Sequence, residues 1–177
     1  MEDIISRDNK KIKHIVQLYK RKYRTTHQEF VAEGYRTVMD MLPTGTVRYV
    51  IVNIESIKQE QLEPLLSLCD IYDVQVFSIS DNLWKGIETT VHGQGIIAVV
   101  CQKVHRLEDF RVKENGLYVL IDGVQDPGNL GTLIRTAVGA GVRAMFLTSN
   151  TVDIYNEKTV RSTMSGLYKS VIYTIRS

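Results

Sequence analysis

Short apolar segments alternate with segments of helical periodicity along this chain, and that alternation restricts the fold more than any other feature. β-branched and aromatic residues predict strands at residues 30–32, 48–52, 74–79 and 95–101. Apolar residues at helical spacing predict helices between these strands. Because 95–101 is apolar almost throughout, it is typical of a strand that is covered on both faces. The pattern predicts a three-layer α/β domain over residues 1–103.

A second alternation follows a charged segment. Residues 104–116 carry six charged side chains and end in a glycine, which predicts a linker. Beyond the linker, the pattern predicts strands at 117–122, 143–148 and 171–175, with helices at 129–140 and 157–167 between them. Strands that alternate with helices favour a second α/β domain with a parallel sheet over residues 117–177.

The cysteine, histidine and hydropathy patterns bear on location and metal binding. Cys69 and Cys101 lie far apart in apolar surroundings, which favours reduced thiols in an intracellular protein. The acidic amino terminus lacks a signal sequence, and no run of about 18 apolar residues occurs. We therefore expect a cytoplasmic protein with no membrane partner. The four histidines are dispersed, and we expect no metal site.

Positive charge is concentrated near the amino terminus. Residues 7–24 contain eight Lys or Arg and one acid, a net charge of +7 within a chain whose total is +2. Apolar residues recur at helical spacing in this segment, which predicts one amphipathic helix with a basic outer face. Such a helix can bind a polyanion, because its cations release counterions from the phosphates of the polyanion. The alternative is an ordinary solvated surface helix. No aromatic stacking platform is evident between the basic residues.

The segment 117–137 carries the most specific signal. It reads as a buried strand, a glycine-punctuated loop and a helix, and open α/β sheets bind ligands at the carboxyl ends of their strands. No Lys-Ser or Lys-Thr pair follows Gly131, so the loop is not a Walker A motif. Its glycines also lack the spacing of a dinucleotide-binding fingerprint. Gly131 is expected to permit close approach of a neighbouring element.

The residues of this loop resemble a known family. Asp126-Pro127-Gly128-Asn129-Leu130-Gly131, followed by Arg135 and Ala137, is similar to the first signature of the SpoU (TrmH-like) RNA ribose 2′-O-methyltransferases, which belong to the SPOUT class. Lys158 to Thr163 resembles a later family segment, although Ser165-Gly166 stands where Gly-Ala is more usual. Residues 7–24, 30–34 and 94–99 resemble the family's RNA substrate-binding domain, an α/β domain like those of small RNA-binding ribosomal proteins.

The resemblance implies a fold and an activity. The expected activity is methyl transfer from S-adenosylmethionine to a ribose 2′-hydroxyl of rRNA or tRNA, with rRNA favoured. The expected catalytic domain is an α/β knot, incomplete here, in a protein that forms a homodimer at full length. The same resemblance favours RNA contacts by the basic segment, through Lys10, Lys11, Lys13, Lys20, Arg21, Lys22 and Arg24.

Two residues are candidates for catalysis. Asn129 and Arg135 are both expected to face the loop mouth from the predicted helix, where Asn129 orients the hydroxyl. The Arg135 guanidinium would bind an adjacent phosphate and stabilise developing alkoxide charge. The proton acceptor is left open, because the pKa of arginine exceeds about 12. The alternatives are that Asn129 caps the helix and that Arg135 is an ordinary exposed residue.

The segment that begins at Leu117 is short for an independent domain of about 100 to 150 residues. We therefore expect a fragment of a longer methyltransferase, or a natural truncation, with most cofactor-binding residues outside these 177. Such a chain would not bind S-adenosylmethionine measurably, and apolar residues around Leu120, Phe146 and Ile172 would lack partners. The alternative functions are a non-catalytic RNA-binding module and a small-molecule α/β enzyme that holds phosphate at the Gly128 loop.

Overall fold

The computed structural model of the protein describes residues 1–89 and 94–175. The chain forms two compact units, Met1–Gln102 and Lys103–Ser177, and each is described by itself.

The first unit is built on a five-stranded sheet in the order β1-β4-β3-β5-β2. Its strands are β1 (Glu2–Asp3), β2 (Glu29–Glu33), β3 (Val47–Asn53), β4 (Gln75–Ile79) and β5 (Ile96–Cys101). β4 runs parallel to β1 and β3, whereas β5 runs antiparallel to β2 and β3. All of β5 except its last residue is buried, as its apolar sequence predicts.

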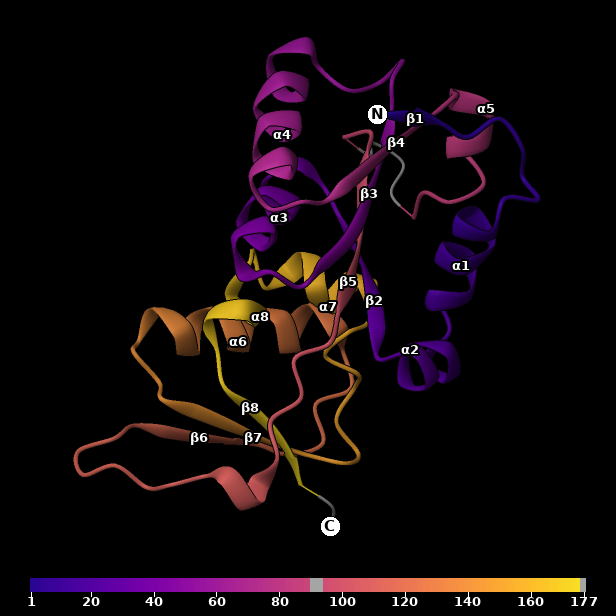
Figure 1. Ribbon diagram of the computed structural model, residues 1–177. Helices are drawn as coiled ribbons and strands as arrows, with labels where there is room; N and C mark the ends of the chain where they lie inside the picture. The colour runs from indigo at the N-terminus through magenta and orange to yellow at the C-terminus, as the bar shows by residue number, and fades with distance from the viewer. Residues whose placement is uncertain (90–93, 176–177) are drawn as a thin grey trace. The chain divides into compact units, whose positions relative to one another are not determined.

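Helices cover both faces of this sheet (Figure 1). One face carries α3 (Tyr35–Met41), which continues into the short 3₁₀ helix η1 (Leu42–Thr44), and α4 (Gln59–Ile71). The other face carries α1 (Lys10–Leu18) and α5 (Asp81–Trp84), and α2 (Arg21–His27) follows α1. On that face Ile15, Leu18 and Trp84 pack with strand residues in one buried cluster. The predicted three-layer α/β architecture is confirmed.

The basic segment forms two helices instead of the single one predicted. α1 ends at Leu18, and α2 begins at Arg21 after Lys20 adopts an extended conformation. The carbonyls that end α1 are satisfied from α2, because the buried Arg24 side chain donates to the backbone oxygens of Leu18 and Tyr19 at 2.8 and 2.9 Å. This tertiary contact closes α1, and helical periodicity alone does not reveal it.

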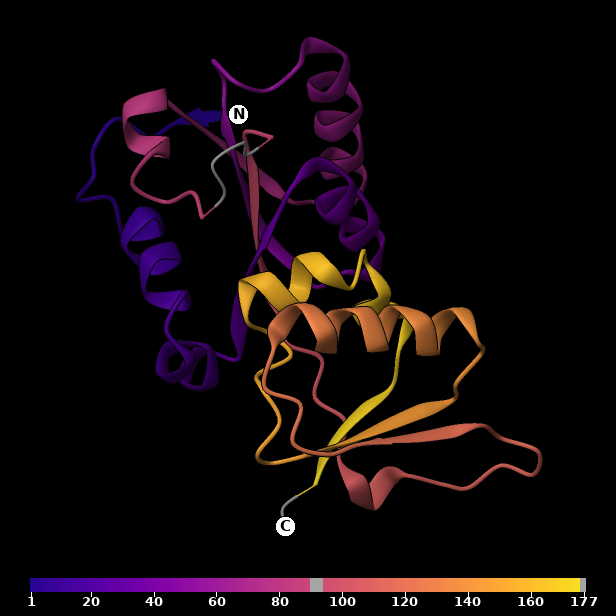
Figure 2. The ribbon, with the colours of Figure 1, turned by 180° about the vertical axis from the view of Figure 1, so that it is seen from behind.

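The second unit contains a parallel sheet in the order β6-β7-β8. Its strands are β6 (Tyr118–Ile121), β7 (Ala144–Thr148) and β8 (Ile172–Ile175). The helices α6 (Pro127–Gly139), α7 (Glu157–Ser162) and α8 (Gly166–Lys169) lie on one face of this sheet (Figure 2). The predicted parallel α/β sheet is confirmed, and the knot stays a prediction.

The single helix predicted at 157–167 is wrong, because α7 ends at Ser162 and α8 begins at Gly166. Met164 and Ser165 between them have φ values of 46° and 68°. These left-handed conformations cannot continue a right-handed helix. Ser165 stands where the resembled family more often has glycine, the residue that adopts this conformation without strain.

The segment 104–116, expected to be a linker, lies within the second unit. It contains the short 3₁₀ helix η2 (Leu107–Asp109), and the Phe110 ring that follows packs against Phe146 with 4.9 Å between ring centroids. Phe146 is therefore partly covered, and Ile172 is buried, contrary to the expectation that both lack partners. Leu120 on the edge strand β6 is 64% exposed, as expected.

Candidate functional site

The glycine-punctuated loop lies at the carboxyl ends of β6 and β7. Its conformation is fixed by Thr148, the last residue of β7: the Gly123 N–H donates to the Thr148 hydroxyl oxygen at 3.2 Å, and that hydroxyl donates to Asp122 at 2.8 Å. Gly123 has a φ of 64°, which lets the chain turn directly after the strand. The loop thus begins where open α/β sheets usually bind ligands.

Asp126, not Asn129, caps α6. The Asp126 Oδ1 atom accepts a hydrogen bond from the Asn129 backbone N–H at 2.7 Å, and its Oδ2 atom lies 3.7 Å from the Lys158 ammonium. The Asn129 N–H, and then the charge of Lys158, hold the pKa of Asp126 below its usual range. The Asn129 side chain is exposed and makes no hydrogen bond within the described residues. The capping alternative for Asn129 is therefore wrong, and its amide is available to a ligand.

Arg135 is exposed in the third turn of α6, and its Nη1 atom donates to the Met164 thioether sulfur at 2.8 Å. Six residues along an α-helix correspond to a rise of about 9 Å and a rotation of about 240°. The side chains of Asn129 and Arg135 therefore leave α6 on different turns and in different directions. That both side chains face one loop mouth stays a prediction, because the arginine side chain is long enough to reach beyond its own turn.

Arg135 lies beside the contact that α6 makes with the helices α7 and α8, which we call the seam. Along this seam a Cβ atom built on Gly131 would lie 2.4 Å from Ser162 Cβ, and a Cβ atom built on Gly166 would lie 3.5 Å from Arg135 Cα. Gly131 permits close approach of two helices, as predicted. The seam also carries the exposed ammonium of Lys158, whose Cε lies 3.7 Å from where a Gly128 Cβ would be.

The basic segment divides into exposed and packed residues. We call the exposed set the α1–α2 basic surface, and it consists of Lys10, Lys13, Lys20, Arg21 and Lys22. Lys11 is only partly exposed, and its ammonium lies 4.5 and 5.3 Å from the ring centroids of Phe77 and Tyr49. Arg24 is 4% exposed and caps α1, so it does not contribute to this surface and is corrected to a structural residue.

Aromatic rings accompany this surface, although none was evident from the sequence. Tyr23 and His27 stack at 6.3 Å with an 11° interplanar angle, and the His14 ring meets the His27 ring edge-on at 4.9 Å. His14 is held in place by Glu29, with 2.6 Å between Nε2 and Oε2. The four-residue spacing of Tyr23 and His27 was the available signal, because side chains four apart are neighbours on a helix.

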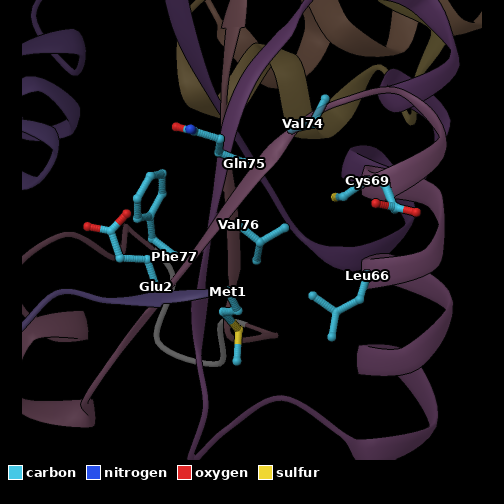
Figure 3. Close-up of a pocket in the computed structure, with 9 residues that line it drawn as sticks. Met1, Glu2, Leu66, Cys69, Val74, Gln75, Val76 and Phe77 are labelled. Carbon is cyan, nitrogen blue, oxygen red and sulfur yellow. The ribbon is translucent and has the colours of Figure 1, made fainter.

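The first unit also has a hollow between β4 and α4 (Figure 3), with a volume of about 550 Å³. Cys69, Leu66 and Val76 point into the space between these elements, whereas the Glu2 carboxylate lies on the other side of β4, beside Phe77. Burial raises the pKa of the Cys69 thiol to about 11, so it is protonated and unreactive near neutral pH. No Lys or Arg is among the described residues that line this hollow, and it therefore lies outside the candidate RNA surface.

No cluster of three His, Cys, Asp or Glu residues suited to a metal ion occurs in residues 1–89 and 94–175. Over the same residues, every helix is too short or too polar to cross a membrane.

Comparison with known proteins places both units in one family. A profile for the MRM3-like substrate binding domain matches residues 9–98, and a profile for the SpoU rRNA Methylase family matches residues 116–177. A similar curated protein is the 23S rRNA (guanosine(2553)-2'-O)-methyltransferase RlmP of Bacillus subtilis, 35% identical over 92% of this chain and 60% of its own length. Another is the mitochondrial rRNA methyltransferase 3 of Xenopus laevis, 27% identical over 94% of this chain and 40% of its own length.

A similar solved structure is the AdoMet-bound rRNA methyltransferase of Sinorhizobium meliloti. It superposes with a TM-score of 0.86 at 28% identity, over 99% of this chain and 65% of that one. The chain thus spans about 60% or less of the two curated relatives. Because the two profiles follow one another along the chain and the solved structure matches nearly all of it, this chain belongs to the SpoU rRNA methylase family, with an MRM3-like substrate-binding domain ahead of the methylase segment.

Proposed function

We propose that the protein transfers a methyl group from S-adenosylmethionine to a ribose 2′-hydroxyl of rRNA. The observation that carries this proposal is the loop from Asp122 to Asn129, which matches the SpoU profile and lies at the carboxyl ends of two parallel strands. The family relationship supports the reaction, and the two curated relatives, both named as rRNA methyltransferases, support rRNA over tRNA. The specific nucleotide is not assigned.

Asn129 and Arg135 have different roles in this proposal. The unpartnered Asn129 amide, at the first turn of α6, orients the 2′-hydroxyl. The Arg135 guanidinium binds the adjacent phosphate and stabilises negative charge on the attacking oxygen, since a charged fork is suited to both tasks. To do so it exchanges its weak thioether contact with Met164 for the phosphate.

S-adenosylmethionine supplies an electrophilic methyl group when bound. The fit of this cofactor to the loop is supported by the exposed polar groups of Asp122 and Asn129. Ligands of open α/β sheets bind at the carboxyl ends of the strands, where this loop begins. No residue of this chain is assigned to the adenosyl or methionine groups.

The α1–α2 basic surface is proposed to hold the RNA by its phosphates. Its five exposed cations project from consecutive helices and are accompanied by the Tyr23 and His27 rings, a combination suited to single-stranded RNA. A homodimer and a cytoplasmic location are further parts of the proposal, and the relatives include both bacterial and mitochondrial proteins.

The proposal is tested by methyl transfer from tritium-labelled S-adenosylmethionine to rRNA. The protein is expressed from its own gene, so that any flanking coding sequence is retained. Arg135→Ala should lower single-turnover transfer about 100-fold or more with little change in cofactor affinity, because the lost interaction is made mainly in the transition state. Arg135→Lys should restore little, since it lacks the planar fork.

The matched control is Arg143→Ala, which removes an exposed arginine at the opposite, amino-terminal end of β7. This variant should transfer at the unaltered rate. Near-normal turnover by Arg135→Ala would contradict the proposed role of Arg135. RNA binding without any methyl transfer would favour the alternative of a non-catalytic RNA-binding module.

A further inference from the structure

A groove lies between α1 and α5 on the first unit, with a volume of about 420 Å³. Its floor is apolar and rigid, because Ile12 and Leu83 are only 5 and 6% exposed. Val16 forms one wall and is 44% exposed, so its apolar side chain is accessible to a ligand in the groove. Gly86 adds backbone without a side chain, so the groove stays open on the α5 side.

Polar and cationic groups border this apolar floor. The Arg7 guanidinium is fixed at the α5 side by hydrogen bonds from Nη2 to the Asn82 side-chain oxygen at 2.9 Å and to its backbone oxygen at 3.3 Å. Lys13 and Gln17 border the groove from α1. The Gln17 amide offers both a donor and an acceptor to a ligand in the groove.

The charge around the groove favours an anionic ligand. Two cations line the groove, namely Arg7 and Lys13, and Lys13 also belongs to the α1–α2 basic surface. Three acids lie nearby: Asp8 is 2.7 Å from the Lys13 ammonium, Asp81 in α5 is 2.8 Å from that of Lys85, and Glu88 accepts a hydrogen bond from the Trp84 indole N–H at 2.8 Å. Asp8 and Lys13 are both largely exposed, so water screens their pair and a phosphate can compete for the lysine.

We propose that this groove holds one unstacked base of single-stranded RNA, with the adjoining phosphates on Arg7 and Lys13. The inference rests on the proposed RNA-binding function and extends it by naming a base-binding site. A base has two apolar faces and a polar edge, which fit the apolar floor and the Gln17 amide respectively. Sequence-specific RNA recognition commonly targets bases that are turned out of single-stranded loops.

The experiment compares two RNA probes on the full chain by fluorescence anisotropy. One probe is a single-stranded oligonucleotide of mixed sequence, and the other has the same backbone with abasic positions throughout. Val16→Ser should bind the normal probe about three- to tenfold more weakly, because apolar contact with the base is lost. It should bind the abasic probe as the unaltered protein does, and the salt dependence should not change, because no cation is removed.

Two further variants sharpen the test. Gln17→Ala removes the border amide and should weaken binding of the normal probe alone. Ile71→Ser is the matched control, since Ile71 is 70% exposed on α4, across the sheet from the groove, and its loss should affect neither probe.

The inference is overturned if Val16→Ser binds the normal probe as tightly as the unaltered protein, or weakens both probes equally. Either outcome leaves RNA binding itself intact. The proposed RNA-binding function fails separately, if removal of Lys20, Arg21 and Lys22 changes neither affinity nor salt dependence.

Discussion

Gly131 of α6 lies so close to Ser162 of α7 that a Cβ atom at position 131 would be 2.4 Å from the Ser162 Cβ atom. The Thr159 backbone oxygen would lie only 2.9 Å away, so a rigid backbone also blocks this position. The helix that bears Asn129 and Arg135 is thereby fixed against α7. The glycine of the family signature has a packing role in this chain.

Gly131→Ala should lower the free energy of unfolding of the second unit by about 1 to 3 kcal/mol, since α6 and α7 must move apart. The matched control is Gly139→Ala, at the last position of the same helix, where an added Cβ meets nothing within 4 Å. That variant should be neutral or slightly stabilising, because alanine favours helix more than glycine does. Urea unfolding followed by circular dichroism measures both, and equal effects would contradict the close-packing argument.

Ser165→Gly should stabilise the protein by about 1 kcal/mol, because Ser165 has a φ of 68°, which strains any residue with a Cβ atom. The Ser165 hydroxyl is also buried without a hydrogen-bond partner among the described residues. Ser165→Ala separates the two causes, since it removes the hydroxyl and keeps the strain. A thermal melt in which the alanine variant equals the glycine variant would show that backbone strain is unimportant here.

Asp126 should contribute stability that is lost in acid. Its folded-state pKa lies below the unfolded value of 3.8, so the contribution is fully present above that value and is lost as the pH falls through the folded pKa. Asp126→Asn keeps a capping oxygen but cannot titrate. Between about pH 6 and about pH 3, the urea midpoint of this variant should fall less than that of the unaltered protein.

Replacing Lys20, Arg21 and Lys22 of the α1–α2 basic surface with alanine should weaken RNA binding and flatten its salt dependence. Each lost phosphate contact removes roughly 0.7 to 0.9 from the slope of log affinity against log salt concentration. Lys58→Ala, an exposed lysine next to α4, should leave the slope unchanged. A slope unaffected by the triple change would contradict the assignment of this surface.

Arg24 should behave differently from those three residues. Arg24→Ala removes two hydrogen bonds to the end of α1, one buried and one partly buried, and should lower the free energy of unfolding by about 2 kcal/mol. Chemical denaturation measures this loss directly, and an unchanged midpoint would contradict the capping role.

Much of the local structure was predictable. The strand at 96–101 and the loop-to-helix segment at 122–139 follow from apolar patterning and from the Pro-Gly pair, which act within a few residues. The candidate residue Asn129 was likewise found from its motif. Helical periodicity was misleading at Lys20 and at Ser165. At each of these positions it predicted one continuous helix, whereas the structure has two.

The sequence by itself determined the order of strands and helices, the concentration of charge near the amino terminus and the family signature, because each is a property of neighbouring residues. Only the tertiary structure decided that Phe110 covers Phe146 and that Arg24 is buried. It also decided that Val16 borders a groove. Burial of a side chain and the direction in which it points depend on elements that are distant in the sequence, and local periodicity does not encode which of those elements will meet.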